Sequence, residues 1–120
     1  KSAEAIPYFL EARRVIAKGW GKDHPALGWV LTSLGSAYLE QKRSGQALAV
    51  LEEALVRIAK EPDPEALGQT RFALARAHAA LGHRTQARDF ARAAVEAYLA
   101  AQGTHDKPIA KINKWLAAHP

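Results

Sequence analysis

The chain has 120 residues, of which 48% are hydrophobic, and its 17 basic and 12 acidic side chains give a formal net charge of +5. The absence of cysteine excludes disulfides, thiolate catalysis and cysteine-ligated zinc, and no apolar run is long enough to predict a membrane span. Alanine supplies more than a fifth of the residues, which favours closely packed helices. The absence of cysteine fits a reducing compartment, so we expect a cytoplasmic location. The chain begins at Lys1 and contains no methionine, so we expect a fragment of a longer protein.

The N-terminal half predicts three helices. The first covers about residues 2–18, and the apolar side chains expected on its inward face are Ile6, Phe9, Leu10, Val15 and Ile16. The link that follows contains two glycines and Asp23, which predict a helix stop and then an N-cap. Pro25 opens the second helix, because proline loses no hydrogen bond in a first turn. That helix runs to about residue 41, and a turn at 42–45 leads to a third helix over about 45–60.

The C-terminal half predicts three more helices. A double proline break over 61–65 separates the halves, with Asp63 expected as the N-cap and Pro64 in the first turn of the fourth helix. This helix ends near Gly82, and a fifth covers about 84–102. The last begins at Thr104 or Asp106 and contains Pro108, Ile109, Ile112, Trp115 and Leu116. The predicted fold class is therefore all-α.

A triplet with small residues at its first and third positions recurs along these helices. It is seen at Ala5-Phe9-Ala12, Ala47-Leu51-Ala54 and Ala87-Ala91-Ala94, so that its start recurs after 42 and then 40 residues. The second and third triplets follow a helix with a small residue, Gly35 or Ala75, that allows a close crossing. One such helix pair cannot bury its apolar face alone, so neighbouring pairs must stack.

The triplets and their spacing resemble tetratricopeptide repeats. The resemblance implies a right-handed superhelix of helix hairpins closed by a C-terminal capping helix. We divide the single domain into 1–20, the second helix of a truncated repeat, two repeats at 24–60 and 63–103, and a cap at 105–119. The link and first repeat resemble the long tetratricopeptide repeat variant found in kinesin light chains. The segments that carry this resemblance are Gly21-Lys22-Asp23-His24-Pro25, Leu31, Leu34-Gly35, Tyr38, Ala47-Leu48 and Glu53-Ala54-Leu55.

The second half is also similar to the repeat arrays attached to bacterial serine/threonine protein kinases. The similarity rests on residues 71–77, Ala97-Tyr98 and 115–119. Because the sequence contains none of the kinase motifs, we expect no kinase activity and no other catalysis in this chain. The resemblance implies a regulatory or scaffolding module of a larger bacterial protein that binds protein partners.

In this architecture the first helix of each repeat lines a concave groove. The resemblance and the helical register together assign the groove residues Trp29, Thr32, Ser33, Ser36, Leu39, Glu40, Gln69, Phe72, Ala73, Arg76 and Ala79. We expect a peptide or helix ligand held by the apolar anchors Trp29, Leu39 and Phe72, with Arg76 as a charged contact. The asparagine pair of kinesin-light-chain-like repeats is replaced here by Thr32-Ser33 and Phe72-Ala73. The carboxylate clamp of chaperone cofactors is absent, so chaperone binding is not predicted.

Two alternatives remain open. Arg84, Arg88 and Arg92 recur at every fourth position and could form a nucleic-acid- or phosphate-binding stripe, although Asp89 and Glu96 lie among them and favour a solvated outer face. The chain could also be a purely structural spacer. No cofactor or metal site is predicted, because no two of the five histidines are spaced for ligation on one helix. Those histidines are expected to be structural.

Overall fold

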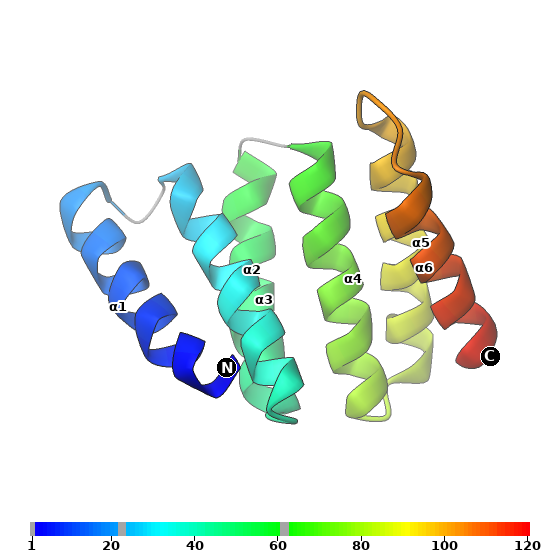
Figure 1. Ribbon diagram of the computed structural model, residues 1–120, viewed down its shortest axis with the longest axis horizontal. Coiled ribbons are helices and arrows are strands. Elements are labelled where there is room, and N and C mark those ends of the chain that lie inside the picture. The colour runs from blue at the N-terminus through cyan, green and yellow to red at the C-terminus, as the bar shows by residue number, and fades with distance from the viewer. Residues whose placement is uncertain (1, 22–23, 61–62) are drawn as a thin grey trace.

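The residues that the structure describes fold into six helices, which follow one another in a layered stack (Figure 1). The computed structural model describes residues 2–21, 24–60 and 63–120, and within these ranges it contains no strand. The helices are α1 Ser2–Gly19, α2 Pro25–Glu40, α3 Ser44–Lys60, α4 Pro64–Ala80, α5 Arg84–Ala100 and α6 Asp106–Ala118. The all-α prediction is confirmed, and the helix boundaries lie close to those expected from the turn residues.

The helix ends show why the chain breaks where it does. Pro64 begins α4, and the Asp63 carboxylate accepts a hydrogen bond of 3.1 Å from the Glu65 amide, as predicted. At the start of α2 the predicted cap was wrong, because the imidazole Nδ1 of His24 accepts the Ala26 amide at 3.1 Å. Asp23, to which that role was assigned, lies outside the described residues.

Consecutive helices pack side by side, so the molecule is elongated, with extents of 42 × 32 × 24 Å. In Figure 1, α2, α4 and α6 lie in front of α3 and α5, and α1 and α6 lie at opposite ends of the stack. Besides its sequence neighbours α1 and α3, α2 also contacts α4, which joins one hairpin to the next. The α2, α4 and α6 row forms one broad face of the molecule.

Glycines let the paired helices approach closely. A Cβ atom placed on Gly35 would lie 2.4 Å from Cγ of Leu51, and one placed on Gly28 would lie 2.8 Å from Cγ1 of Ile58. Both distances are shorter than carbon atoms tolerate, so α2 and α3 lie this close only because these positions are glycine. The crossing at Gly35 was predicted, whereas the role of Gly28 was not.

The second hairpin repeats this packing 40 residues later. A Cβ atom on Gly68 would lie 2.6 Å from the Tyr98 ring, which reproduces the Gly28–Ile58 contact between α4 and α5. The residues 40 positions after Gly35 and Leu51 are Ala75 and Ala91, which are both fully buried in the same core cluster. A glycine facing leucine in one hairpin thus corresponds to two alanines in the next, so each crossing keeps a small residue on the first helix of the pair.

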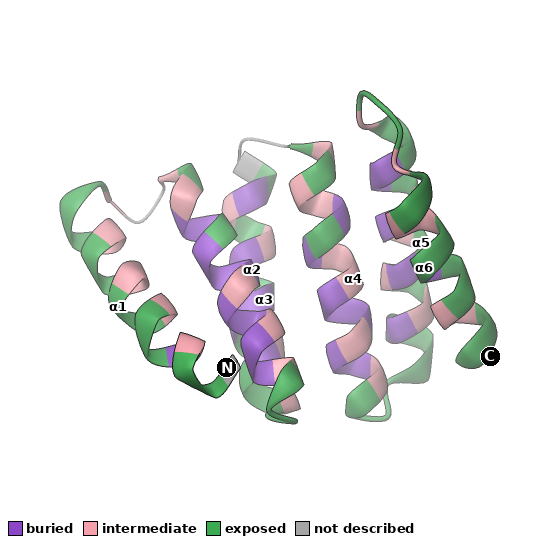
Figure 2. Ribbon diagram, viewed as in Figure 1, coloured by how far each residue is buried: buried purple, intermediate pink, exposed green. Residues whose placement is uncertain are grey.

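The buried residues lie mainly on the inward faces of the four central helices (Figure 2). Among the described residues, α1 contributes Ile6 and α6 contributes Ile112 to the buried hydrophobic set. The prediction that Leu10 and Val15 of α1 face inward was wrong, since both side chains are exposed. The physical reason is that α1 packs on α2 along one side, while no other described helix packs against its opposite side.

The crossing geometry predicts a compensating pair of substitutions. We expect Gly35→Ala to lower the free energy of unfolding by about 1–3 kcal/mol, because the new methyl group displaces Leu51. Leu51→Ala alone should cost about 2–5 kcal/mol through the cavity it leaves. The double variant recreates the Ala75–Ala91 pair. Its loss of unfolding free energy should therefore be smaller than the sum of the losses in the two single variants, by about 1 kcal/mol or more. Urea unfolding curves of the three variants measure these losses.

The control for this cycle is Arg92→Ala, a change at an exposed side chain that should stay within about ±0.5 kcal/mol. Strictly additive losses in the double variant would contradict a shared crossing of Gly35 and Leu51.

Candidate peptide-binding groove

A chain of adjoining cavities runs along the face formed by α2, α4 and α6. The first, of about 400 Å³, shares Ser36 and Gln69 with a second of about 190 Å³. That one shares Phe72, Arg76 and Lys111 with a third of about 520 Å³. Because neighbouring cavities share lining residues, they form one continuous groove.

The N-terminal part of the groove is lined mostly by uncharged side chains. Ser33, Ser36 and Glu40 come from α2, and Gln69 faces them from α4. These four residues were assigned to the groove by register, and the structure brings them together. Ala5 and Phe9 of α1 complete the wall, a contribution that register alone did not indicate because α1 was treated as the second helix of a truncated repeat.

Thr32, also assigned to the groove, has a different role. It is only 9% exposed, and its hydroxyl oxygen lies 2.8 Å from the hydroxyl of Thr70 and donates to the Gly28 carbonyl at 3.0 Å. Since the Thr32 proton goes to Gly28, Thr70 is the donor in the pair. Thr32 lines the 400 Å³ cavity, but its hydroxyl is engaged in joining α2 to α4.

The C-terminal part of the groove is aromatic and basic. The Phe72 ring of α4 meets the Trp115 ring of α6 edge to face, with centroids 5.7 Å apart and planes at 88°. Arg76, Lys111 and Lys114 line the same 520 Å³ cavity. The sequence had assigned Phe72 and Arg76 but had treated α6 only as a cap, so Lys111, Lys114 and the groove-side position of Trp115 were missed.

The two remaining assigned anchors lie toward the ends of the groove. Leu39 is half-buried and lines a further cavity of about 510 Å³ with Arg76 and Trp115. Trp29 is 63% exposed and lies one helical turn before Ser33 on the same face of α2, but it does not line these cavities. Ala73 and Ala79 line the 190 Å³ and 510 Å³ cavities respectively.

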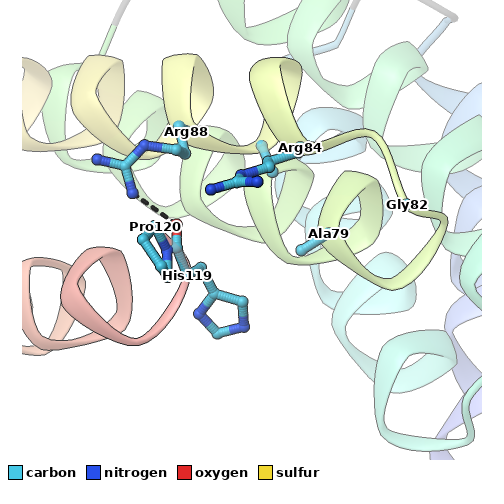
Figure 3. Close-up of a pocket in the computed structure, with 7 residues that line it drawn as sticks. Ala79, Gly82, Arg84, Arg88, His119 and Pro120 are labelled. Carbon is cyan, nitrogen blue, oxygen red and sulfur yellow. Dashed lines mark hydrogen bonds between the residues drawn. The ribbon is translucent and has the colours of Figure 1, made fainter.

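The three arginines of α5 do not form a free basic stripe. Figure 3 shows two of them, Arg84 and Arg88, beside His119 and Pro120 at the chain end. Arg88 donates to the carbonyl oxygens of Leu116 at 3.0 Å and His119 at 2.5 Å, so it fixes the C-terminal end of α6. Arg92 lies 3.8 Å from the Asp89 carboxylate. Arg84 lines a separate cavity of about 360 Å³ beside the chain end. The expectation that Arg88 is an exposed surface residue was wrong, because its partners lie on a helix that is distant in sequence.

Two histidines form a contact that helical spacing did not indicate. His78 is 8% exposed, stacks on the Phe90 ring at 5.4 Å, and lies with its Nδ1 atom 2.9 Å from Nδ1 of His83. Burial, together with the neighbouring His83, lowers the pKa of His78, while the Glu52 carboxylate acts weakly in the opposite direction. In the preceding hairpin the same positions carry Tyr38 and Arg43, whose guanidinium lies 4.9 Å from the Tyr38 ring centroid.

Neither a metal centre nor a membrane span is found among the residues that the structure describes. Within residues 2–21, 24–60 and 63–120, no group of three or more histidine or carboxylate side chains could hold a metal ion. No helix in these ranges is both long and apolar enough to cross a membrane.

The stacked hairpins and their continuous groove define a helical-repeat protein. A protein-family model described as tetratricopeptide repeat matches residues 1–60, which is half of the chain. The chain therefore belongs to the tetratricopeptide repeat family. Repeats of this family generally mediate protein–protein interaction and are generally not catalytic. No curated protein matches the sequence.

The His78 environment predicts a loss of stability in mild acid. The pKa of His78 in the folded chain lies below its unfolded value of about 6.5, so the contribution of neutral His78 to the stability of the fold is fully present above that pH. It is lost as the pH falls from about 6.5 toward the folded pKa, because the unfolded chain then binds the proton more readily. We expect the urea midpoint to fall between pH 7.5 and pH 5.5, and less so in the double variant His78→Tyr/His83→Arg, which copies Tyr38 and Arg43.

His105→Gln serves as the control, because His105 lies in the link before α6, away from this contact. A pH dependence unchanged in the double variant and abolished in the control would show that His78 is not its source.

Arg88 predicts a second structural effect. We expect Arg88→Ala to increase hydrogen exchange of the α6 amides by about fivefold or more, because charge-assisted bonds contribute about 1.5–3 kcal/mol when buried and less at half exposure. Arg92→Ala should leave these rates unchanged. Equal protection of α6 in both variants would mean that the two carbonyl contacts do not hold the helix.

Proposed function

We propose that this chain is a non-catalytic module for protein–protein interaction that holds a peptide or helix in the groove lined by α2, α4 and α6. The observation that carries the proposal is the continuity of the groove through shared lining residues Ser36, Gln69, Phe72 and Arg76. A pocket for one small molecule would be closed, whereas this groove extends across the three helices α2, α4 and α6. An extended surface of this kind suits a linear segment of another protein.

We further propose that the module is a scaffold or regulatory part of a larger bacterial protein that acts in the cytoplasm. Support comes from the resemblance of the link and first repeat to kinesin-light-chain-like repeats and of the second half to kinase-attached repeat arrays. The proposed organisation keeps two full repeats at 24–60 and 63–103 and a cap at 105–119.

The groove is a better candidate than the α5 arginines. Arg88 already binds two carbonyl groups, and Arg92 lies beside a carboxylate. Nucleic-acid affinity depends on several cations that can each replace condensed counterions on phosphates. With two of the three arginines engaged, the stripe offers little for such binding.

Blocking the groove tests the proposal. Peptides are selected from a display library of randomised linear sequences against the immobilised chain, and their affinities are measured by fluorescence anisotropy. We expect Ser36→Phe/Gln69→Phe to lower the affinity of the chain for these peptides by about tenfold or more, because the rings fill the space that the ligand occupies. Val56→Phe/Leu99→Phe also introduces two phenylalanines, at exposed positions of α3 and α5, and should leave affinity within about twofold.

Selected peptides that bind both double variants equally would contradict the groove assignment. The failure to select any peptide would favour the spacer alternative. A single-stranded oligonucleotide that binds the chain and is released by Arg84→Ala/Arg92→Ala would favour the basic module.

A further inference from the structure

The groove has an uneven distribution of charge along its length. At the α4–α6 end, the 520 Å³ cavity is lined by the three cations Arg76, Lys111 and Lys114 and by a single carboxylate, Glu40. The α1–α2 end is lined by alanine, phenylalanine, hydroxyl and amide side chains together with the same Glu40. The positive charge is therefore concentrated at the end formed with α6.

These cations have no acidic partner of their own within the described residues. Across residues 2–21, 24–60 and 63–120, neither Arg76, Lys111 nor Lys114 takes part in an ion pair. Other arginines are engaged: Arg13 lies 3.1 Å from Glu53, and Arg14 contacts Glu11. The charge at the α4–α6 end thus remains available to a ligand.

An apolar surface lies directly beside this charge. Phe72 and Trp115 are half-buried and line the same cavity as the three cations. A ligand that places an apolar side chain against these rings brings its neighbouring groups next to Arg76, Lys111 and Lys114. Carboxylates at those positions add a charge attraction to the apolar contact with the rings.

We propose that the occupant of the groove is an acidic linear peptide, whose aspartate or glutamate side chains lie at the α4–α6 end beside an apolar residue packed on Phe72 and Trp115. This inference rests on the proposed function and specifies its partner. The cations at this end of the groove are Lys111 and Lys114 on α6 and Arg76 on α4, and they are spread along the 520 Å³ cavity. Such dispersed charges fit several carboxylates along an extended chain better than one compact phosphate, which needs donors that converge on a point.

The test uses the randomised peptide library and a pair of charge reversals matched in number. We expect the selected peptides to be enriched in aspartate and glutamate. We also expect Lys111→Glu/Lys114→Glu to lower the affinity for these peptides by about tenfold or more. Raising the salt concentration from about 50 mM to about 500 mM should also lower the affinity for these peptides, because salt partly screens the attraction between the lysines and the peptide carboxylates. Lys107→Glu/Arg92→Glu makes the same change of net charge at exposed positions outside this cavity and should change affinity by less than about twofold. Circular dichroism confirms that each variant is folded.

The possible outcomes separate the inference from the proposed function. Peptides without acidic enrichment that tolerate Lys111→Glu/Lys114→Glu but are lost in Ser36→Phe/Gln69→Phe would overturn the inference and leave the groove function standing. Peptides that tolerate both pairs, or a library that yields none, would overturn both. An oligothymidine that binds the chain through Lys111 and Lys114 while no acidic peptide does would replace the peptide with a nucleic acid.

Discussion

The close approach of the two helices in each hairpin is the constraint on which the rest of the structure depends. Gly28 and Gly35 lie two turns apart on α2, and side chains of α3 lie directly against the helix backbone at both points. With α2 held along its length in this way, the face that carries Ser33, Ser36 and Glu40 is turned to the groove. The positions that set helix spacing therefore also orient the binding surface, although they do not touch a ligand.

The same logic explains which sequence differences the second hairpin tolerates. The Gly28–Ile58 contact returns as Gly68–Tyr98, with a larger side chain against a glycine, whereas Gly35–Leu51 returns as two alanines. Each pair keeps a small residue where the helices cross. Between hairpins the constraint is different: Thr32 and Thr70 share a buried hydrogen bond, which favours one register of α2 against α4.

Much of the fold was predictable because it depends on local or periodic signals. Helix ends follow proline, aspartate and glycine. The assignment of Ser36, Gln69 and Phe72 to the groove combined the helical register with the resemblance to tetratricopeptide repeats, whose first helices line a groove. The unpredicted features depend on contacts between distant segments. Thr70 is 38 residues from Thr32, Arg88 binds the carbonyl of Leu116, and α6 belongs to no complete repeat from which the register of Lys111 could be read.

The cap helix is more than an end cover, because it forms a wall of the groove. Its position is fixed by three contacts: Ile112 is buried in the second core cluster, Trp115 packs on Phe72, and Arg88 binds the carbonyls at its C-terminal end, where a cation also complements the helix dipole. Lys111 and Lys114 thus extend from a backbone held on both sides. A charged site on a fixed helix loses less entropy on binding than one on a free segment. Arg88 therefore contributes to the groove indirectly, by holding the helix that carries its charge.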